Sequence, residues 1–176
     1  MIDDIRDQQR QFRQACGKFA TGITVLMVKV GAELHGMTAN AFMSVSLDPL
    51  LVAVSVSKAS KMHTYLHPND VIFTISILHA RQKMVAEMFG RPHRYPPMEP
   101  QFSVVNGGYP VVHDPAAWFL CQKDQSVDAG DHTIVVGRVH SFGEREHHPL
   151  VFYSGQYFSR LSDEVEEMVE FSLLEQ

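Results

Sequence analysis

Long hydrophobic runs are missing from this sequence. A helix that spans a bilayer needs about 18 or more consecutive apolar residues, whereas the apolar stretches here are short, as at residues 23–28. The first seven residues carry three aspartates and an arginine around two isoleucines, and such a segment does not predict a secretory signal. We therefore expect a cytoplasmic protein with no membrane partner.

Cysteine is scarce as well. The two cysteines, Cys16 and Cys121, form no C-x-x-C pair, so a metal knuckle is not indicated. In a reducing compartment we expect both thiols to be free and buried rather than bridged. His63 and His67 have the spacing of metal ligands on a helix, but no glutamate lies between them as in the H-E-x-x-H motif. The sequence therefore predicts no metal centre.

Three glycine-containing motifs of nucleotide-binding and hydrolytic enzymes are also missing. No G-x-G-x-x-G follows a predicted strand, which argues against a Rossmann site. No G-x-x-x-x-G-K-[ST] occurs, so a P-loop enzyme is excluded. No G-x-S-x-G occurs, so the nucleophile elbow of the α/β-hydrolases is excluded too.

A stripe of basic residues is lacking, and the charge is uneven. The formal net charge is −5. Six of the 20 acidic residues lie between positions 163 and 175, where there is no basic residue. The remaining acidic residues nearly balance the 15 basic ones. Because a nucleic-acid surface needs clustered lysines and arginines, no nucleic-acid partner is expected.

What the sequence does contain is a pattern of short strands. Its 176 residues are 45% hydrophobic, enough for one domain with a continuous core. Periodicity predicts helices at residues 5–19, 60–67 and 81–89, and a loop at residues 90–100, where four prolines occur. It predicts strands at residues 23–30, 34–38, 50–57, 71–78, 117–122, 133–140 and 150–153. Because no βαβ rhythm appears, we expect a mainly β barrel with flanking helices.

Three segments combine side chains that suit a flat, phosphorylated ligand. At residues 35–50 small side chains would let a ligand approach the backbone, and Thr38 and Asn40 can bond a ring edge. Residues 55–64 place serines and lysines at the predicted start of a helix, which Ser60 can cap. A helix N-terminus with such side chains beside it suits a phosphate. His132 opens an apolar strand beside a turn. The alternatives are a polar turn, a capped surface helix and a structural histidine.

Taken in order along the chain, these segments resemble the flavin reductase-like family of FMN-binding split barrels. The resemblance covers roughly residues 10 to 160, and it includes residues 82–89 of the predicted helix. Its other motifs are F-A-T-G-I-T-V (19–25), G-M-T-A-N-A-F (36–42), S-V-S-L-D-P-L (44–50), S-K-A-S (57–60), G-D-H (130–132) and P-L-V-F-Y (149–153).

The resemblance implies a fold, cofactors and a site. The fold would be a six-stranded antiparallel split β-barrel at residues 1–162, usually a homodimer, followed by an acidic helical tail at residues 163–176. The enzyme would transfer hydride from NADH or NADPH to FMN or FAD, and many members supply reduced flavin to a separate monooxygenase. His132 would lie on the nicotinamide side as the catalytic candidate. The implied flavin contacts are Thr38, Ala39, Asn40 and Ala41 at the ring, Ser55, Val56, Ser57 and Ser60 near the phosphate, and Phe89.

Two other functions remain open. A split-barrel oxidase acting on a pyridoxine phosphate would need more phosphate-binding arginines than the sequence offers. A non-catalytic flavin- or heme-binding split-barrel module is the second alternative, since the chain is rich in histidine. Hydride transfer between nicotinamide and flavin is carried by the cofactors themselves, so the sequence need not contain an acid–base pair.

Overall fold

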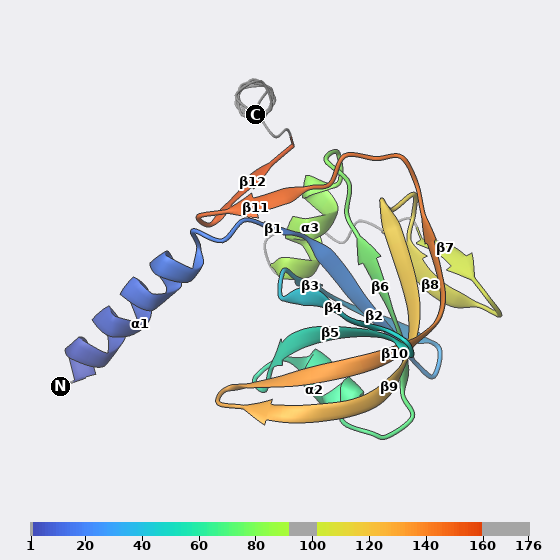
Figure 1. Ribbon diagram of the computed structural model, residues 1–176, viewed down its shortest axis with the longest axis horizontal. Coiled ribbons are helices and arrows are strands. Elements are labelled where there is room, and N and C mark those ends of the chain that lie inside the picture. The colour runs from blue at the N-terminus through green and yellow to red at the C-terminus, as the bar shows by residue number, and fades with distance from the viewer. Residues whose placement is uncertain (1, 92–101, 160–176) are drawn as a thin grey trace, which may run out of the picture.

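The computed structural model describes residues 2–91 and 102–159, which form a β structure with three helices (Figure 1). The helices are α1 (Ile2–Cys16), α2 (Lys61–Leu66) and α3 (Lys83–Gly90). The strands are β1 (Thr21–Gly22), β2 (Thr24–Val30), β3 (Glu33–Ala39), β4 (Phe42–Leu47), β5 (Leu50–Ser57), β6 (Ile72–Ile77), β7 (Phe102–Val105), β8 (Tyr109–Val112), β9 (Ala117–Ala129), β10 (His132–Glu144), β11 (Val151–Tyr153) and β12 (Gln156–Phe158).

The main sheet has seven strands in the order β3-β2-β6-β9-β10-β5-β4, and every neighbouring pair is antiparallel. Its two edge strands, β3 and β4, are consecutive in the chain and are joined at Asn40 and Ala41. The sheet therefore curls until its edges meet at this corner, which is the arrangement of a split barrel. The mainly β class is confirmed. The main sheet has seven strands against the six expected, because the backbone breaks at this corner and the segment after it pairs with β5 as a strand of its own.

Two hydrophobic clusters lie on opposite sides of β2. Leu26 and Val28 pack in one cluster with residues of β5, β6 and α2. Val25 and Met27 pack in the other with Ala86 of α3 and residues of β8. A strand buried on both faces needs a continuous apolar run rather than alternation, which explains the sequence T-V-L-M-V at its start.

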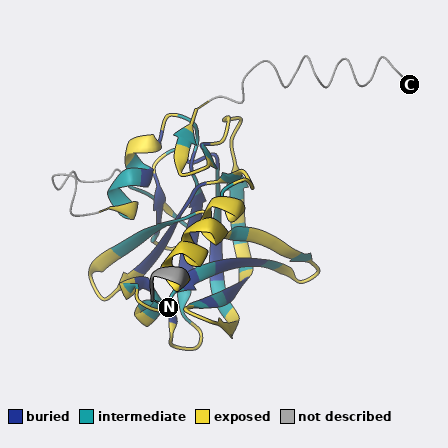
Figure 2. Ribbon diagram, turned by 90° about the vertical axis from the view of Figure 1, so that its left-hand side faces the viewer, coloured by how far each residue is buried: buried dark blue, intermediate teal, exposed yellow. Residues whose placement is uncertain are grey.

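Helix α1 projects away from the barrel (Figure 1), and Figure 2 shows that it is mostly exposed. Its apolar face is exposed, with 71% of Phe12 and 53% of Ile5 accessible, and Phe19 after it is 78% exposed. The prediction that both thiols are buried is wrong for Cys16, which is exposed at the end of this helix. Cys121 is free and buried, and burial raises the pKa of its thiol to about 12. None of the helices in the described ranges is long and apolar enough to cross a membrane.

The predicted start of the second helix is confirmed. The Ser60 hydroxyl accepts a hydrogen bond from the His63 amide at 3.2 Å, as an N-cap residue does. Strands β4, β7, β8 and β12 were not predicted from periodicity. The four prolines of residues 92–100 and the acidic tail at residues 163–176 lie outside the described residues, so the division into domain and tail remains a prediction.

Candidate functional site

Three of the predicted site residues, Ser55, Ser57 and His132, share one face of the sheet. In the antiparallel ladder between β5 and β10, Ser57 is opposite His132 and Ser55 is opposite Ile134. Directly opposite residues share a face of the sheet, and residues two apart on a strand share it too. The side chains of Ser55, Ser57, Ile134 and His132 therefore lie on the same face, and Ala53 continues it along β5.

The corner at Asn40 and Ala41 borders this face. The Ala41 carbonyl accepts a hydrogen bond of 3.0 Å from the Ser55 amide, which fixes the corner against β5. Asn40 is exposed, and its amide makes one long contact of 3.4 Å with the Thr21 hydroxyl. Most of the hydrogen-bonding capacity of that amide is therefore available to a ligand.

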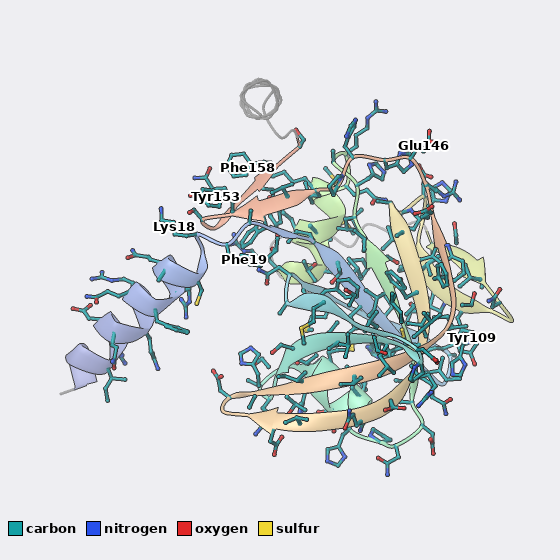
Figure 3. All side chains as sticks on the ribbon, in the orientation of Figure 1. Lys18, Phe19, Tyr109, Glu146, Tyr153 and Phe158 are labelled. Carbon is teal, nitrogen blue, oxygen red and sulfur yellow. The ribbon has the colours of Figure 1, made fainter. Side chains whose placement is uncertain are left out.

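A pocket of about 820 Å³, called here the large pocket, opens above this face. It is bounded by the corner, by β5 and β10, by the end of α1 and by the hairpin of β11 and β12. Figure 3 labels Phe19 and Tyr153 where α1 approaches that hairpin, and the Lys18 ammonium lies 5.9 Å from the centre of the Tyr153 ring. The lining includes Phe19, Asn40, Ala41, Phe42, Ala53, Ser55, Ile134 and Phe152.

A second space of about 450 Å³, the small pocket, adjoins the large one. Asn40, Phe152 and Gly155 line both pockets. Thr38 and Ala39 line the small pocket together with Lys83 and Arg91 from α3 and its end. Glu87 lines the small pocket as well. The predicted ring-binding residues thus line two connected spaces, one mostly apolar and one bordered by charged groups of both signs.

Three of the predicted hydroxyl groups already have partners. The Thr38 hydroxyl donates to the Ala86 carbonyl at 2.6 Å, so it can accept a hydrogen bond from a ligand but has no proton left to donate. The Ser60 hydroxyl donates to the Ser57 carbonyl at 2.7 Å while it caps α2. The Ser57 hydroxyl accepts from the Ala59 amide at 3.3 Å and keeps its own proton free.

His132 lies at the tip of the hairpin between β9 and β10. Its Nδ1 is 2.8 Å from a carboxylate oxygen of Asp131, and 42% of its side chain is exposed. The hydrogen bond with His132 holds the pKa of Asp131 below its usual range. Because Nδ1 faces Asp131, the other ring nitrogen is the one that can meet a ligand.

Two predicted contact residues have buried roles. The Val56 side chain is fully buried in the core, and its backbone is paired with Thr133 in the ladder. Phe89 packs in the second hydrophobic cluster and lies over Gly36, where an added β-carbon would come within 2.4 Å of the ring. In this structure Val56 and Phe89 therefore shape the walls behind the site, and neither lines the large or the small pocket.

The sequence reasoning missed the contribution of the hairpin of β11 and β12. Phe152 and Gly155 line both pockets, and Tyr157 lines the small one. Gly155 has φ +81, a backbone conformation that favours glycine, in the tight turn between the strands. The signal was present in P-L-V-F-Y, but nothing in that motif says that it pairs with β1, some 130 residues earlier.

Comparison with known proteins agrees with this geometry. The family model described as "Flavin reductase like domain" matches residues 16–160. The NADH-dependent flavin reductase StyB of Pseudomonas fluorescens is 37% identical over 153 residues, which are 85% of this chain and 88% of the relative. An NADH-dependent flavin reductase of a Rhodococcus species is 41% identical over 151 residues, with 84% of each chain covered.

Some relatives are longer. The chain spans 50% of the length of the reductase component of a flavin-dependent trigonelline monooxygenase from Acinetobacter baylyi, to which it is 37% identical, and the match takes in 89% of this chain.

Two solved structures share the fold closely. The flavin reductase PheA2 has a TM-score of 0.81 at 41% identity, with 87% of this chain and 98% of that chain covered. The NADH:FAD oxidoreductase SgcE6 of Streptomyces globisporus, in complex with NAD and FAD fragments, has a TM-score of 0.81 at 32% identity, with 89% and 94% covered. The corner, the serine-bearing face and the family model, which spans nearly all of the described barrel, lead to one conclusion: this chain belongs to the flavin reductase-like family.

Proposed function

We propose that this chain is an NADH-dependent flavin reductase that reduces FMN or FAD and supplies the reduced flavin to a separate monooxygenase. The observation that carries the proposal is the large pocket of about 820 Å³ beside a face of small side chains, in a chain 37% and 41% identical to NADH-dependent flavin reductases. The size lies within the usual range for pockets that enclose small organic ligands.

The residues present fit a flavin. Ala41 and Ala53 carry only a β-carbon, so a flat ring can lie against the backbone there. Phe42 and Phe152 supply apolar wall, and the Asn40 amide can bond a polar ring edge. Ser57 keeps a hydroxyl proton for a phosphate oxygen, two residues along the strand from Ser55.

Hydride transfer from nicotinamide to flavin is chemistry that the two bound molecules supply. The chain has to hold their rings in contact, at about 3–3.5 Å between the reacting atoms. The corner and β5 would bind one ring, while the exposed nitrogen of His132 would position the nicotinamide nucleotide from the hairpin tip. Phe19 and Phe152 would exclude water from the apolar side.

The active form would be a homodimer in the cytoplasm. Its support is the apolar surface that one chain leaves exposed around the large pocket: Phe12 and Phe19 at α1, and Met43, Val45 and Leu47 along the edge strand β4. Exposed apolar groups of this number are typical of an interface, and a two-fold dimer is the commonest assembly. A Phe12→Glu variant should lower the mass seen by light scattering from two chains to one. A wild-type mass of one chain would contradict the dimer.

The activity is tested with the purified full-length chain. The oxidation of NADH is measured as the loss of its absorbance. It should require added or bound flavin and should proceed with FMN or FAD. Under anaerobic conditions the flavin absorbance should bleach with one equivalent of NADH. If the protein binds flavin but neither NADH nor NADPH bleaches the flavin absorbance, the chain is the non-catalytic binding module instead.

A further inference from the structure

Three side chains of types that can bind a metal meet from separate connections at the end of the barrel, and none of them lines either pocket. His79 follows β6, Asp114 precedes β9 and His147 follows β10, on the segment where Figure 3 labels Glu146. One nitrogen or oxygen atom from each of the three residues lies within 4.8 Å of the other two. No metal centre was predicted here, and the separations of these residues, 35 and 33 positions along the chain, match no metal-binding motif.

The carboxylate of Asp114 is held in place from two sides. One oxygen lies 3.2 Å from Nε2 of His147, and the other lies 3.2 Å from the Arg145 guanidinium. The His147 ring also packs on the His79 ring, with centroids 4.7 Å apart. Arg145 therefore occupies one carboxylate oxygen and leaves the other facing the two imidazoles, as the outer partners of a ligating carboxylate do.

We propose that His79, Asp114 and His147 bind one divalent transition-metal ion of the Zn²⁺ class, with water completing the coordination. Two imidazoles and one carboxylate suit such an ion better than Mg²⁺ or Ca²⁺, which prefer oxygen ligands. Bond lengths of about 2.0–2.2 Å would place tetrahedral ligands about 3.3 Å apart. The widest separation, 4.8 Å, must therefore shorten, and His147 on its exposed connection has the freedom to turn inward.

Two existing contacts would be exchanged. One is the contact between Nε2 of His147 and the Asp114 carboxylate, because both groups would bind the ion instead of each other. The other is at His79. The Arg81 amide donates to Nδ1 of His79 at 3.2 Å, and it lies on the exposed surface. An ion bound at Nδ1 would take the place of this hydrogen bond, and the amide would bond water instead. The exchange costs little because the amide need not become buried and unpaired.

The ion would act on the shape of the barrel end rather than on hydride transfer. Gln82, just before α3, accepts a hydrogen bond from the His79 amide and donates one to the His113 carbonyl. Pro149, just before β11, forms a β-bridge with His79. Helix α3 and strand β11 provide Lys83 and Phe152 to the pockets. A bound ion would therefore link the two connections that precede these pocket walls to the connection that precedes β9.

The test is a titration of the untagged full-length protein with Co²⁺, since a histidine tag would itself bind the probe. We expect visible d–d absorption that saturates at one Co²⁺ per chain, is displaced by Zn²⁺, and accompanies a higher midpoint of thermal unfolding. His147→Ala and Asp114→Asn should each weaken Co²⁺ binding by at least about 10-fold. Asn suits position 114 because φ there is +51, a conformation that asparagine tolerates.

The matched control is His148→Ala, which removes the neighbouring exposed histidine that does not belong to the cluster. It should bind Co²⁺ as the wild type does, and far-UV circular dichroism should show all three variants folded. The proposal is overturned if the wild type shows no saturable Co²⁺ binding. It is also overturned if folded His147→Ala binds Co²⁺ as tightly as the wild type, or if His148→Ala loses binding equally.

Discussion

The amide of Ser55 donates to the carbonyl of Ala41 at 3.0 Å, and this bond joins the two segments to which the sequence assigned a ring and a phosphate. This hydrogen bond lies where the two edges of the sheet meet, and it joins the corner to β5. A ligand in the large pocket would lie against both partners. The geometry of the site therefore depends on how the barrel closes.

A larger side chain at position 55 should block flavin binding in the large pocket. In Ser55→Leu the larger side chain would project into the large pocket, so we expect flavin affinity, measured by quenching of flavin fluorescence, to fall at least about 10-fold, corresponding to about 1.4 kcal/mol. Gln125→Leu, which adds the same side chain at an exposed position of β9, is the control and should bind flavin normally. Equal affinity in Ser55→Leu and the wild type would show that the flavin lies elsewhere.

His132 should matter for the nicotinamide nucleotide and not for flavin. A lost hydrogen bond of this kind costs about 0.5–1.5 kcal/mol, so His132→Ala should lower kcat/KM for NADH by roughly three- to tenfold. Flavin affinity should stay nearly unchanged. Steady-state kinetics with varied NADH at fixed flavin measure kcat/KM for NADH, and quenching of flavin fluorescence measures flavin affinity. A variant with the wild-type kcat/KM for NADH would make His132 a structural residue of the hairpin.

Gly36 and Phe89 should be coupled in stability. A β-carbon on Gly36 would lie 2.4 Å from the Phe89 ring, so Gly36→Ala must displace that ring or β3, at a cost of about 1–3 kcal/mol. Urea unfolding should show the loss. Phe89→Leu should remove much of the overlap, so the double variant should be more stable than the sum of the single changes predicts. Strict additivity would contradict the contact.

The two cysteines should differ in reactivity. Cys16 lines the large pocket and is exposed, whereas Cys121 is buried with a pKa of about 12. Because the thiolate is the reactive form, iodoacetamide at pH 8 should label Cys16 alone in the folded protein, as seen by intact mass. Saturating flavin should slow that labelling. Rapid labelling of Cys121 without denaturant, or no protection of Cys16 by flavin, would disagree with the structure.

The sequence predicted best what local patterns determine. The β-rich run at residues 23–30, the strand at residues 50–57 and the cap at Ser60 all depend on neighbours within a few residues, and the structure contains each of them. Strand β4 was not predicted, because residues 35–50 were interpreted as small side chains that let a ligand approach, with a polar turn as the alternative. Its apolar residues, such as Leu47, are exposed in a single chain, so burial gives no signal for the strand.

Features that join distant segments could not be predicted from spacing. The Thr38 hydroxyl bonds the Ala86 carbonyl 48 residues away, so its proton is not available to a ligand as first expected. Apolar residues at helical spacing usually mark a buried face, but within one chain Phe12 of α1 stays 71% exposed. The cluster at His79 likewise exists only because three connections end at the same place.

The closure of the barrel at Asn40 and Ala41 has a consequence for how the barrel could open. Strands β3 and β4 are the two free margins of one sheet, and a covalent hinge of two residues joins them. Spreading these margins would strain the hydrogen bond from Ser55 to Ala41, while the interstrand ladders of the sheet stay intact. The corner is therefore a place where the barrel could open without breaking a ladder.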